Sequence, residues 1–198
     1  MNADRARIGF LLSGGGRSLE NLHVEIEQRC IPASIELVIS SRSSAGGIER
    51  AQRLGIPHQI HRCQEPGASD RIFEALDAAD CQYALLGGWL RKLEIPHEWS
   101  GRVLNIHPSL LPLHGGAGCY GDHVHRKVLE AQQQTSGCTV HFVDDEFDHG
   151  PKILQLEVPV LVGDTVDELA NRVFEAEKIA YPRALELLLS GEVNFERC

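Results

Sequence analysis

The first half of the chain alternates short apolar runs with amphipathic stretches. The apolar runs predict strands and lie at residues 8–12, 35–39, 58–61 and 83–86. The amphipathic stretches predict one helix after Ser13, in which Leu19, Leu22 and Ile26 share a face, and further helices over residues 46–54 and 69–78. Gly55 is expected to end the second helix. Strands and helices that alternate in this way indicate βαβ units and a parallel sheet.

The second half begins with a different pattern. Residues 102–106 predict a strand, after which Pro108 and Pro112 impose a rigid, non-helical path. Glycines then predict a flexible loop, and Asp122 is the expected N-cap of a helix that ends near residue 133.

The remaining segments predict two strands and a long helix. Residues 138–143 and 153–160 alternate like strands of an antiparallel or mixed part of the sheet. The helix over residues 166–190 is expected to stop at Gly191 and to be kinked or divided at Pro182.

These elements predict an α/β fold with a mostly parallel twisted sheet, helices on both faces and mixed strands in the C-terminal half. A length of 198 residues favours a single domain over residues 1–198. Its two halves differ chemically and divide at about residues 7–100 and 101–193.

The net charge excludes some classes of partner. Lysine and arginine total 19 against 28 aspartate and glutamate residues, which gives −9. A chain so acidic is not expected to bind nucleic acid or a membrane surface, although a local cluster of donors can still hold a small anion. The polar start at residues 1–7 and the absence of a long apolar run predict a cytoplasmic protein.

Cysteine and histidine usage bears on metals. The six cysteines form no CxxC pair, so reduced thiols are expected at Cys30, Cys63, Cys81, Cys119, Cys138 and Cys198. Of the ten histidines, seven lie between His97 and His149. His123 and His125 lack the i, i+4 spacing of a helical metal pair, and no metal is expected.

A glycine-rich turn follows the first predicted strand. The sequence SGGGRS places three glycines and Arg17 between a strand and a helix. Glycines let successive N–H groups approach an anion, and the helix N-terminus adds positive partial charge. The turn matches neither nucleotide-binding fingerprint, and a plain β-to-α turn is the alternative; three glycines exceed what such a turn needs and favour a monophosphate site.

Two candidate catalytic side chains end the strand at residues 102–106. Asn105 and His107 are two residues apart, so both side chains project from the same face at the carboxyl end of that strand. An amide donor and an imidazole are groups that stabilise an oxyanion in acyl transfer. The alternative is a satisfied structural histidine.

An acidic turn, DDEFDHGP, separates the two strands of the C-terminal half. One of its carboxylates could orient a histidine and favour the charged imidazolium. The alternative is a solvated loop, which is the commoner role for four acids in five residues.

Together, NIHPSLLP, SGCTVHFVDDEFDHGPKILQ and SGGGRS resemble the folate-dependent formyltransferases, and are most similar to the branch that formylates glycinamide ribonucleotide in purine biosynthesis. The resemblance implies an enzyme that uses 10-formyltetrahydrofolate as co-substrate and small molecules as its only partners, as a monomer or homodimer. It also implies a catalytic trio of Asn105, His107 and Asp148.

The resemblance assigns two further groups of residues. The substrate phosphate and the ribonucleotide would contact Gly15, Gly16, Arg17, Ser18 and Glu177. The folate would contact Arg71, Leu90, Arg91, Lys92, Leu93, Asn105, Asp144, Asp145, Glu146, Phe147 and Asp148. The segment at residues 113–121 is longer than in compact family members and is expected to form a mobile loop over the site.

Other activities remain open at this point. Formyltetrahydrofolate hydrolase uses a similar trio with water as acceptor, and a sugar-amine formyltransferase uses a different amine. Methionyl-tRNA formyltransferase shares the HPSLLP region but binds tRNA, which the acidic composition disfavours.

Overall fold

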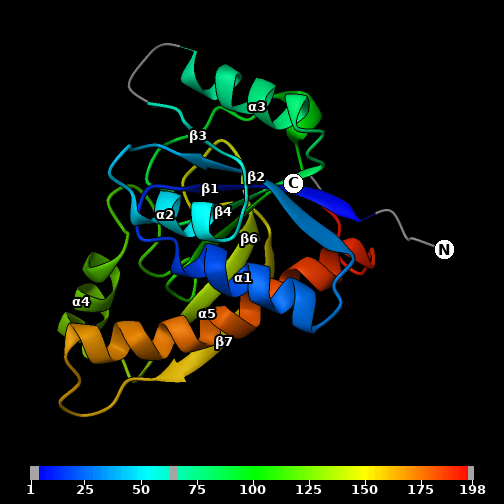
Figure 1. The fold of residues 1–198 in the computed structure, drawn as a ribbon. Coiled ribbons are helices and arrows are strands. Elements are labelled where there is room, and N and C mark those ends of the chain that lie inside the picture. The colour runs from blue at the N-terminus through cyan, green and yellow to red at the C-terminus, as the bar shows by residue number, and fades with distance from the viewer. Residues whose placement is uncertain (1–4, 63–66, 196–198) are drawn as a thin grey trace. The chain divides into compact units, whose positions relative to one another are not determined.

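The computed structural model describes residues 5–62 and 67–195 (Figure 1). The chain divides into two compact units, with the boundary in the sequence between Leu104 and Asn105. Cys63, Cys198 and the first four residues of the polar N-terminal segment lie outside the described residues. Cys30, Cys81, Cys119 and Cys138 are free thiols. Within the described ranges, no helix combines the length and apolar character needed to cross a bilayer.

The first unit alternates strands with helices, as the sequence predicts. Its strands are β1 (Ala6–Leu12), β2 (Ala33–Ser40), β3 (His58–Ile60) and β4 (Tyr83–Gly87). Its helices are α1 (Arg17–Gln28), α2 (Gly46–Arg53), α3 (Ala68–Ala78) and the short 3-10 helix η1 (His97–Trp99), which the sequence pattern does not reveal.

Burial on both faces explains the apolar runs of these strands. β1 pairs in parallel with β2 on one side and with β4 on the other, so that Phe10 lies between Val38 and Leu85. α1 and α2 pack against each other and against β2, whereas α3 lies on the opposite side of these strands (Figure 1). The predicted apolar stripe of α1 is buried. α2 ends at Arg53 with Leu54 as its C-cap, and Gly55 follows with a φ of 69°, the left-handed value typical of a helix stop.

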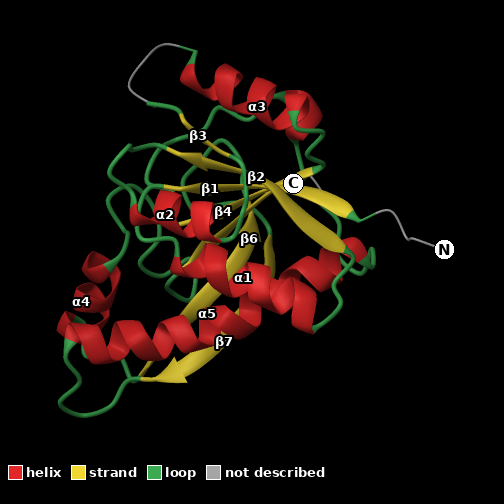
Figure 2. Cartoon of the chain, viewed as in Figure 1, coloured by secondary structure: helices red, strands yellow, loops and turns green. Residues whose placement is uncertain are grey.

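The second unit combines an antiparallel strand pair with two helices. β5 (Val103–His107) contains the boundary between the units, and α4 (Asp122–Glu130), β6 (Thr135–Phe142), β7 (Lys152–Pro159) and α5 (Val166–Leu189) follow it. β6 and β7 pair antiparallel, and α5 packs along both (Figure 2). The predicted antiparallel part of the sheet is therefore confirmed.

One prediction about a helix end is wrong, and of the two outcomes expected at Pro182 the division of the helix does not occur. Gly121, not Asp122, is the N-cap of α4, and Asp122 instead lies in the first turn, where its charge suits the helix dipole. Pro182 lies inside α5 and does not divide it. Its side chain is buried with those of Tyr181 and Ala184 along the packed face of the helix. This packing offsets the loss of the one backbone hydrogen bond that proline cannot donate.

The strands are hydrogen-bonded in the order β3-β2-β1-β4-β5-β6-β7. This is a seven-stranded, mostly parallel α/β sheet of the doubly wound type, with its antiparallel pair at the C-terminal end of the order, as the sequence predicts. The first βα turn of such a fold, here the glycine turn after β1, is where ligands commonly bind.

Candidate functional site

Asn105, His107 and Asp148 lie together in the second unit. Asn105 and His107 end β5, and Asp148 belongs to the turn between β6 and β7. The Asn105 Nδ2 and the His107 Nδ1 are each 3.4 Å from the same oxygen, Oδ1 of Asp148. The side chains of His107 and Asp148 are only 5% and 11% exposed, so these polar groups meet largely out of water.

The Asp148 carboxylate is held from several directions. Its second oxygen, Oδ2, accepts the backbone N–H of Gly116 at 2.9 Å. Burial on its own raises the pKa of this carboxyl, but contacts with His107 and His141, together with the charge of His107 and the Gly116 N–H, hold the pKa well below its usual range. Asp148 is therefore ionised at neutral pH and favours the charged form of a neighbouring imidazole.

His107 is anchored at both ring nitrogens. Its Nε2–H donates to the backbone carbonyl of His114 at 2.9 Å, while Nδ1 faces Asp148. An imidazole with an acceptor beside each nitrogen is suited to carry two protons. The segment at residues 113–121 thus contributes the His114 carbonyl and the Gly116 N–H to the trio, two backbone contacts that no side-chain motif announces.

His141 is a further member of the cluster that sequence reasoning missed. Its side chain is 2% exposed, its Nδ1–H donates to the Phe142 carbonyl at 2.7 Å, and its Nε2 accepts the Asn105 amide at 3.1 Å. The same Nε2 is 3.7 Å from Asp148 Oδ1. A signal was present, because a histidine within the apolar strand TVHFV is out of place unless a partner satisfies it.

The acidic turn is organised by Asp144. Its Oδ1 accepts the N–H of Glu146 at 2.9 Å, and its Oδ2 faces His149 Nδ1 at 2.8 Å. Asp148 adopts a left-handed φ of 55°, which is uncommon for a residue with a side chain. Asp145, Glu146 and Phe147 are exposed, so only Asp148 of this turn enters the cluster with Asn105 and His107.

The glycine turn lies in the first unit, between β1 and α1. Gly16 is the N-cap of α1 with a left-handed φ of 76°, and no side chain within the described residues caps that helix. Gly15 and Arg17 are exposed, whereas Gly16 is buried and Ser18 is half-buried. A helix start whose N–H groups are capped by no side chain is able to accept an anion.

The segment at residues 90–93 follows β4 in the same unit. The backbone N–H of Leu90 donates to the Ser13 hydroxyl at 3.1 Å, which ties this segment to the end of β1. Leu93 is buried, Leu90 and Arg91 are half-buried and Lys92 is exposed.

Two expected contact residues lie on helices. Arg71 is exposed on α3, and its charge adds to the burial that lowers the pKa of His61. Glu177 is half-buried on α5 of the second unit. Burial, reinforced by the charge of Glu177, raises the pKa of the Cys138 thiol on β6 to about 12, so this thiol is inert. In the part of the chain that the structure describes, no group of three or more His, Cys, Asp or Glu side chains could hold a metal ion.

Known proteins resemble this chain over nearly its whole length. The family model described as formyl transferase matches residues 6–185. The chain is 39% identical to the trifunctional purine biosynthetic protein adenosine-3 of Gallus gallus, over 98% of this chain but only 19% of that protein. It is 34% identical to the chloroplastic phosphoribosylglycinamide formyltransferase of Arabidopsis thaliana, over 96% of this chain and 68% of that protein.

Solved structures give the same picture. The glycinamide ribonucleotide transformylase 1 of Symbiobacterium toebii superposes with a TM-score of 0.89 at 36% identity, covering 98% of this chain and 92% of the other. The phosphoribosylglycinamide formyltransferase of Coxiella burnetii superposes with a TM-score of 0.88 at 33% identity, covering 98% and 91%. These likenesses extend through both compact units.

Proposed function

Because the chain belongs to the formyl transferase family, we propose that it transfers a formyl group from 10-formyltetrahydrofolate to the amine of 5-phosphoribosylglycinamide. The products are formylglycinamide ribonucleotide and tetrahydrofolate, as a step of de novo purine biosynthesis. The family model runs through both compact units, which supports a single formyltransferase domain over residues 1–198.

One observation carries this proposal. Two N–H donors, Asn105 Nδ2 and His107 Nδ1, are directed at a single anionic oxygen, Asp148 Oδ1. Acyl transfer to an amine develops negative charge on the former carbonyl oxygen, and convergent donors in a dry site stabilise that charge. Distances of 3.4 Å are loose for hydrogen bonds, as is common before a substrate is bound.

The same contacts define a role for each member of the trio. In this proposal Asn105 and protonated His107 donate to the oxyanion. The His114 carbonyl fixes the imidazole ring by accepting Nε2–H, which leaves Nδ1–H, directed at Asp148 in this structure, as the donor that the oxyanion shares. Asp148, ionised at neutral pH, keeps His107 charged and relays through water the proton that the attacking amine releases.

The remaining residues would bind the substrates. Gly15, Gly16, Arg17 and Ser18 offer N–H groups and a positive charge to the ribose phosphate. Glu177 would contact the glycinamide amine. The folate would contact Arg71, Leu90, Arg91, Lys92, Leu93, Asp144, Asp145, Glu146 and Phe147.

The donor set fits a bound formyl donor, since it contains hydrogen-bond donors for one oxygen. Bound 10-formyltetrahydrofolate supplies the formyl group, and the chain supplies orientation, charge stabilisation and a proton acceptor. The partners are small molecules, and we place the protein in the cytoplasm as a monomer or homodimer that uses neither nucleic acid nor membrane.

An assay under three conditions, two with an amine acceptor and one without, distinguishes this proposal from its alternatives. Purified protein is mixed with 10-formyltetrahydrofolate together with glycinamide ribonucleotide, with a nucleotide-linked sugar amine, or with neither, and tetrahydrofolate release is followed. We expect release only with the ribonucleotide. Release without any amine would identify a hydrolase, and release with the sugar amine alone would identify a sugar-amine formyltransferase.

A variant tests the site itself. His107→Gln keeps a donor but cannot carry a charge, and we expect its kcat to fall roughly 10²-fold or more. Unchanged turnover in this variant would remove His107 from the reaction.

A further inference from the structure

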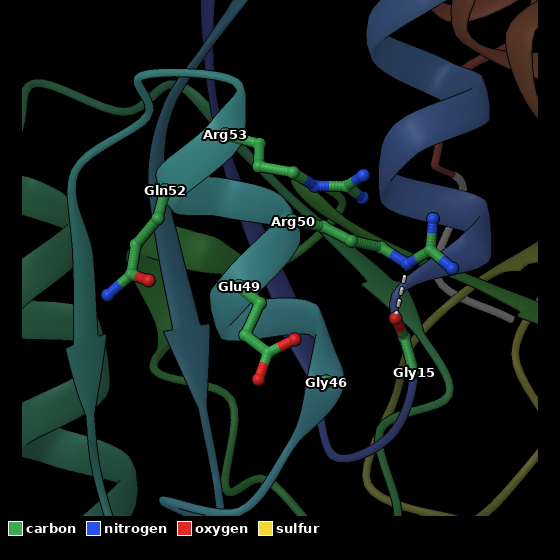
Figure 3. A pocket seen from close by; sticks show the side chains of 6 residues that line it. All are labelled: Gly15, Gly46, Glu49, Arg50, Gln52 and Arg53. Carbon is green, nitrogen blue, oxygen red and sulfur yellow. Dashed lines mark hydrogen bonds between the residues drawn. The ribbon is translucent and has the colours of Figure 1, made fainter.

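The carbonyl groups of the glycine turn are held from behind by α2. The backbone N–H of Gly47 donates to the carbonyl of Gly14 at 3.0 Å. The guanidinium of Arg50 donates through Nε to the carbonyl of Gly15 at 2.8 Å, the contact marked in Figure 3. Two successive carbonyls of the turn are thus bound by one helix.

Peptide planarity transmits this contact to the other side of the turn. In a trans peptide, the carbonyl of one residue and the N–H of the next point in opposite directions. Fixing the Gly14 and Gly15 carbonyls toward α2 therefore directs the N–H groups of Gly15 and Gly16 away from it. Glycine peptides rotate easily, so without such contacts these N–H groups would sample several orientations.

The close approach of α2 depends on glycine. A Cβ built on Gly16 would lie 2.7 Å from the Cα of Gly47, a backbone atom that cannot move aside cheaply. With glycine at both positions, the turn lies directly on the start of α2, within reach of the Arg50 side chain.

Arg50 is itself anchored. Glu20 of α1 binds Arg50 through Oε2 and Arg53 through Oε1, the second contact at 3.1 Å. The open pocket that surrounds these groups is lined by Gly15, Gly46, Glu49, Arg50, Gln52 and Arg53 (Figure 3). Arg50 and Arg53 share the carboxylate of Glu20, so this pocket supports the turn rather than offering an anion site of its own.

We propose that Arg50 is a positioning residue for phosphate recognition: by holding the Gly15 carbonyl, it directs the Gly16 N–H toward the substrate phosphate. The inference rests on the proposed function, in which residues 15–18 bind that phosphate. In this proposal Arg50 has no direct contact with the phosphate. It acts through the peptide group that joins Gly15 to Gly16.

The test compares Arg50→Gln with Arg53→Gln, a control on the same helix that also binds Glu20 but, within the described residues, donates no hydrogen bond to the glycine turn. For each, KM is measured with glycinamide ribonucleotide and with its dephosphorylated riboside, alongside kcat, folate affinity and Tm. Loss of one charge-assisted hydrogen bond predicts a KM for the ribonucleotide raised about tenfold in Arg50→Gln. We expect riboside KM, kcat and folate affinity to change less than about twofold, and Arg53→Gln to resemble the wild type.

A second variant covers the case in which Arg50→Gln does not fold. Glu20→Gln releases the Arg50 anchor without touching the turn, and we expect a smaller rise in the ribonucleotide KM, again with little change for the riboside. If both KM values rise together and Tm falls, Arg50 has only a structural role and the inference is wrong.

The outcomes distinguish a failure of this inference from a failure of the proposed function on which it rests. A wild-type enzyme that does not prefer the ribonucleotide to the riboside would overturn the phosphate site itself. A wild-type preference that persists unchanged in Arg50→Gln and Glu20→Gln would overturn the role of Arg50 and leave the proposed function standing.

Discussion

The glycine turn after β1 and the acidic turn after β6 present groups of opposite polarity, and they reach a left-handed backbone conformation in different ways. The first presents N–H groups, and its conformation comes from glycine, with Gly16 at a φ of 76°. The second presents a carboxylate, and it forces a residue with a side chain, Asp148, to a φ of 55°. Left-handed backbone costs a non-glycine residue about 1 kcal/mol, so Asp148 needs contacts that Gly16 does not.

Those contacts come from similar distances along the chain. The glycine turn is held by α2, which begins about 30 residues further on in the same βαβ arrangement. Asp148 is held by Asn105, His107 and Gly116, which lie on β5 and on the segment that follows it. Both turns are therefore held by contacts from residues 32 to 43 positions away in the chain. The comparison shows that glycine itself supplies the left-handed conformation of the first turn, whereas tertiary contacts have to hold a residue with a side chain in the second.

The largest expected effect on kcat comes from a variant of the acidic turn. Asp148→Asn keeps the shape of the side chain but removes the charge that favours protonated His107. We expect kcat to fall roughly 10²- to 10³-fold with an unchanged circular dichroism spectrum. Glu157→Gln, which removes an exposed acid of β7, is the matched control and should leave kcat unchanged. Equal rates for the two variants would contradict the role given to Asp148.

His141 provides the next test. His141→Leu preserves a buried apolar volume but removes the acceptor of the Asn105 amide and the donor to Phe142. We expect kcat to fall about tenfold, because Asn105 loses the contact that orients it. Steady-state kinetics with saturating substrates measure this, and His123→Gln serves as an exposed-histidine control. A fall in stability without any change in kcat would make His141 purely structural.

A substitution in the glycine turn is predicted to lower the free energy of unfolding. Gly16→Ala forces a Cβ against Gly47 at a left-handed φ, whereas Gly14→Ala adds a Cβ with nothing within 4 Å. We expect the free energy of unfolding to fall by about 1–2 kcal/mol or more for Gly16→Ala, and much less for Gly14→Ala. Denaturant titration compares the two, and equal midpoints would show that the close approach is not required.

The smallest effect concerns His149, which pairs with Asp144 in the acidic turn. The hydrogen bond and charge of Asp144 raise the pKa of this imidazole above its usual value of 6.5. A pKa raised on folding contributes stability that is complete below the unfolded value and is lost as pH rises through the folded value. We expect an NMR pH titration to give a pKa above 6.5 for His149 in the wild type. The value should return toward 6.5 in Asp144→Asn, and an identical titration in both proteins would exclude the pair.

Strand and helix positions follow from the sequence because periodicity reports which face is buried. The stripe of Leu19, Leu22 and Ile26, the Gly55 stop and the antiparallel β6–β7 pair are all present as predicted. The predictions fail where competing effects decide the outcome. Gly121 takes the N-cap position expected of Asp122, and packing along α5 tolerates Pro182.

The candidate site divides in the same manner. Sequence alone determines that Asn105 and His107 share a face, because the two-residue period of a strand requires it. It also determines that the glycine turn precedes a helix. That Asp148 ends beside these two side chains, that His141 joins them, and that the His114 carbonyl and Gly116 N–H complete the cluster were decided only by the folded chain. Backbone groups have no sequence signature, and contacts between residues far apart in the chain exist only once packing has brought them together.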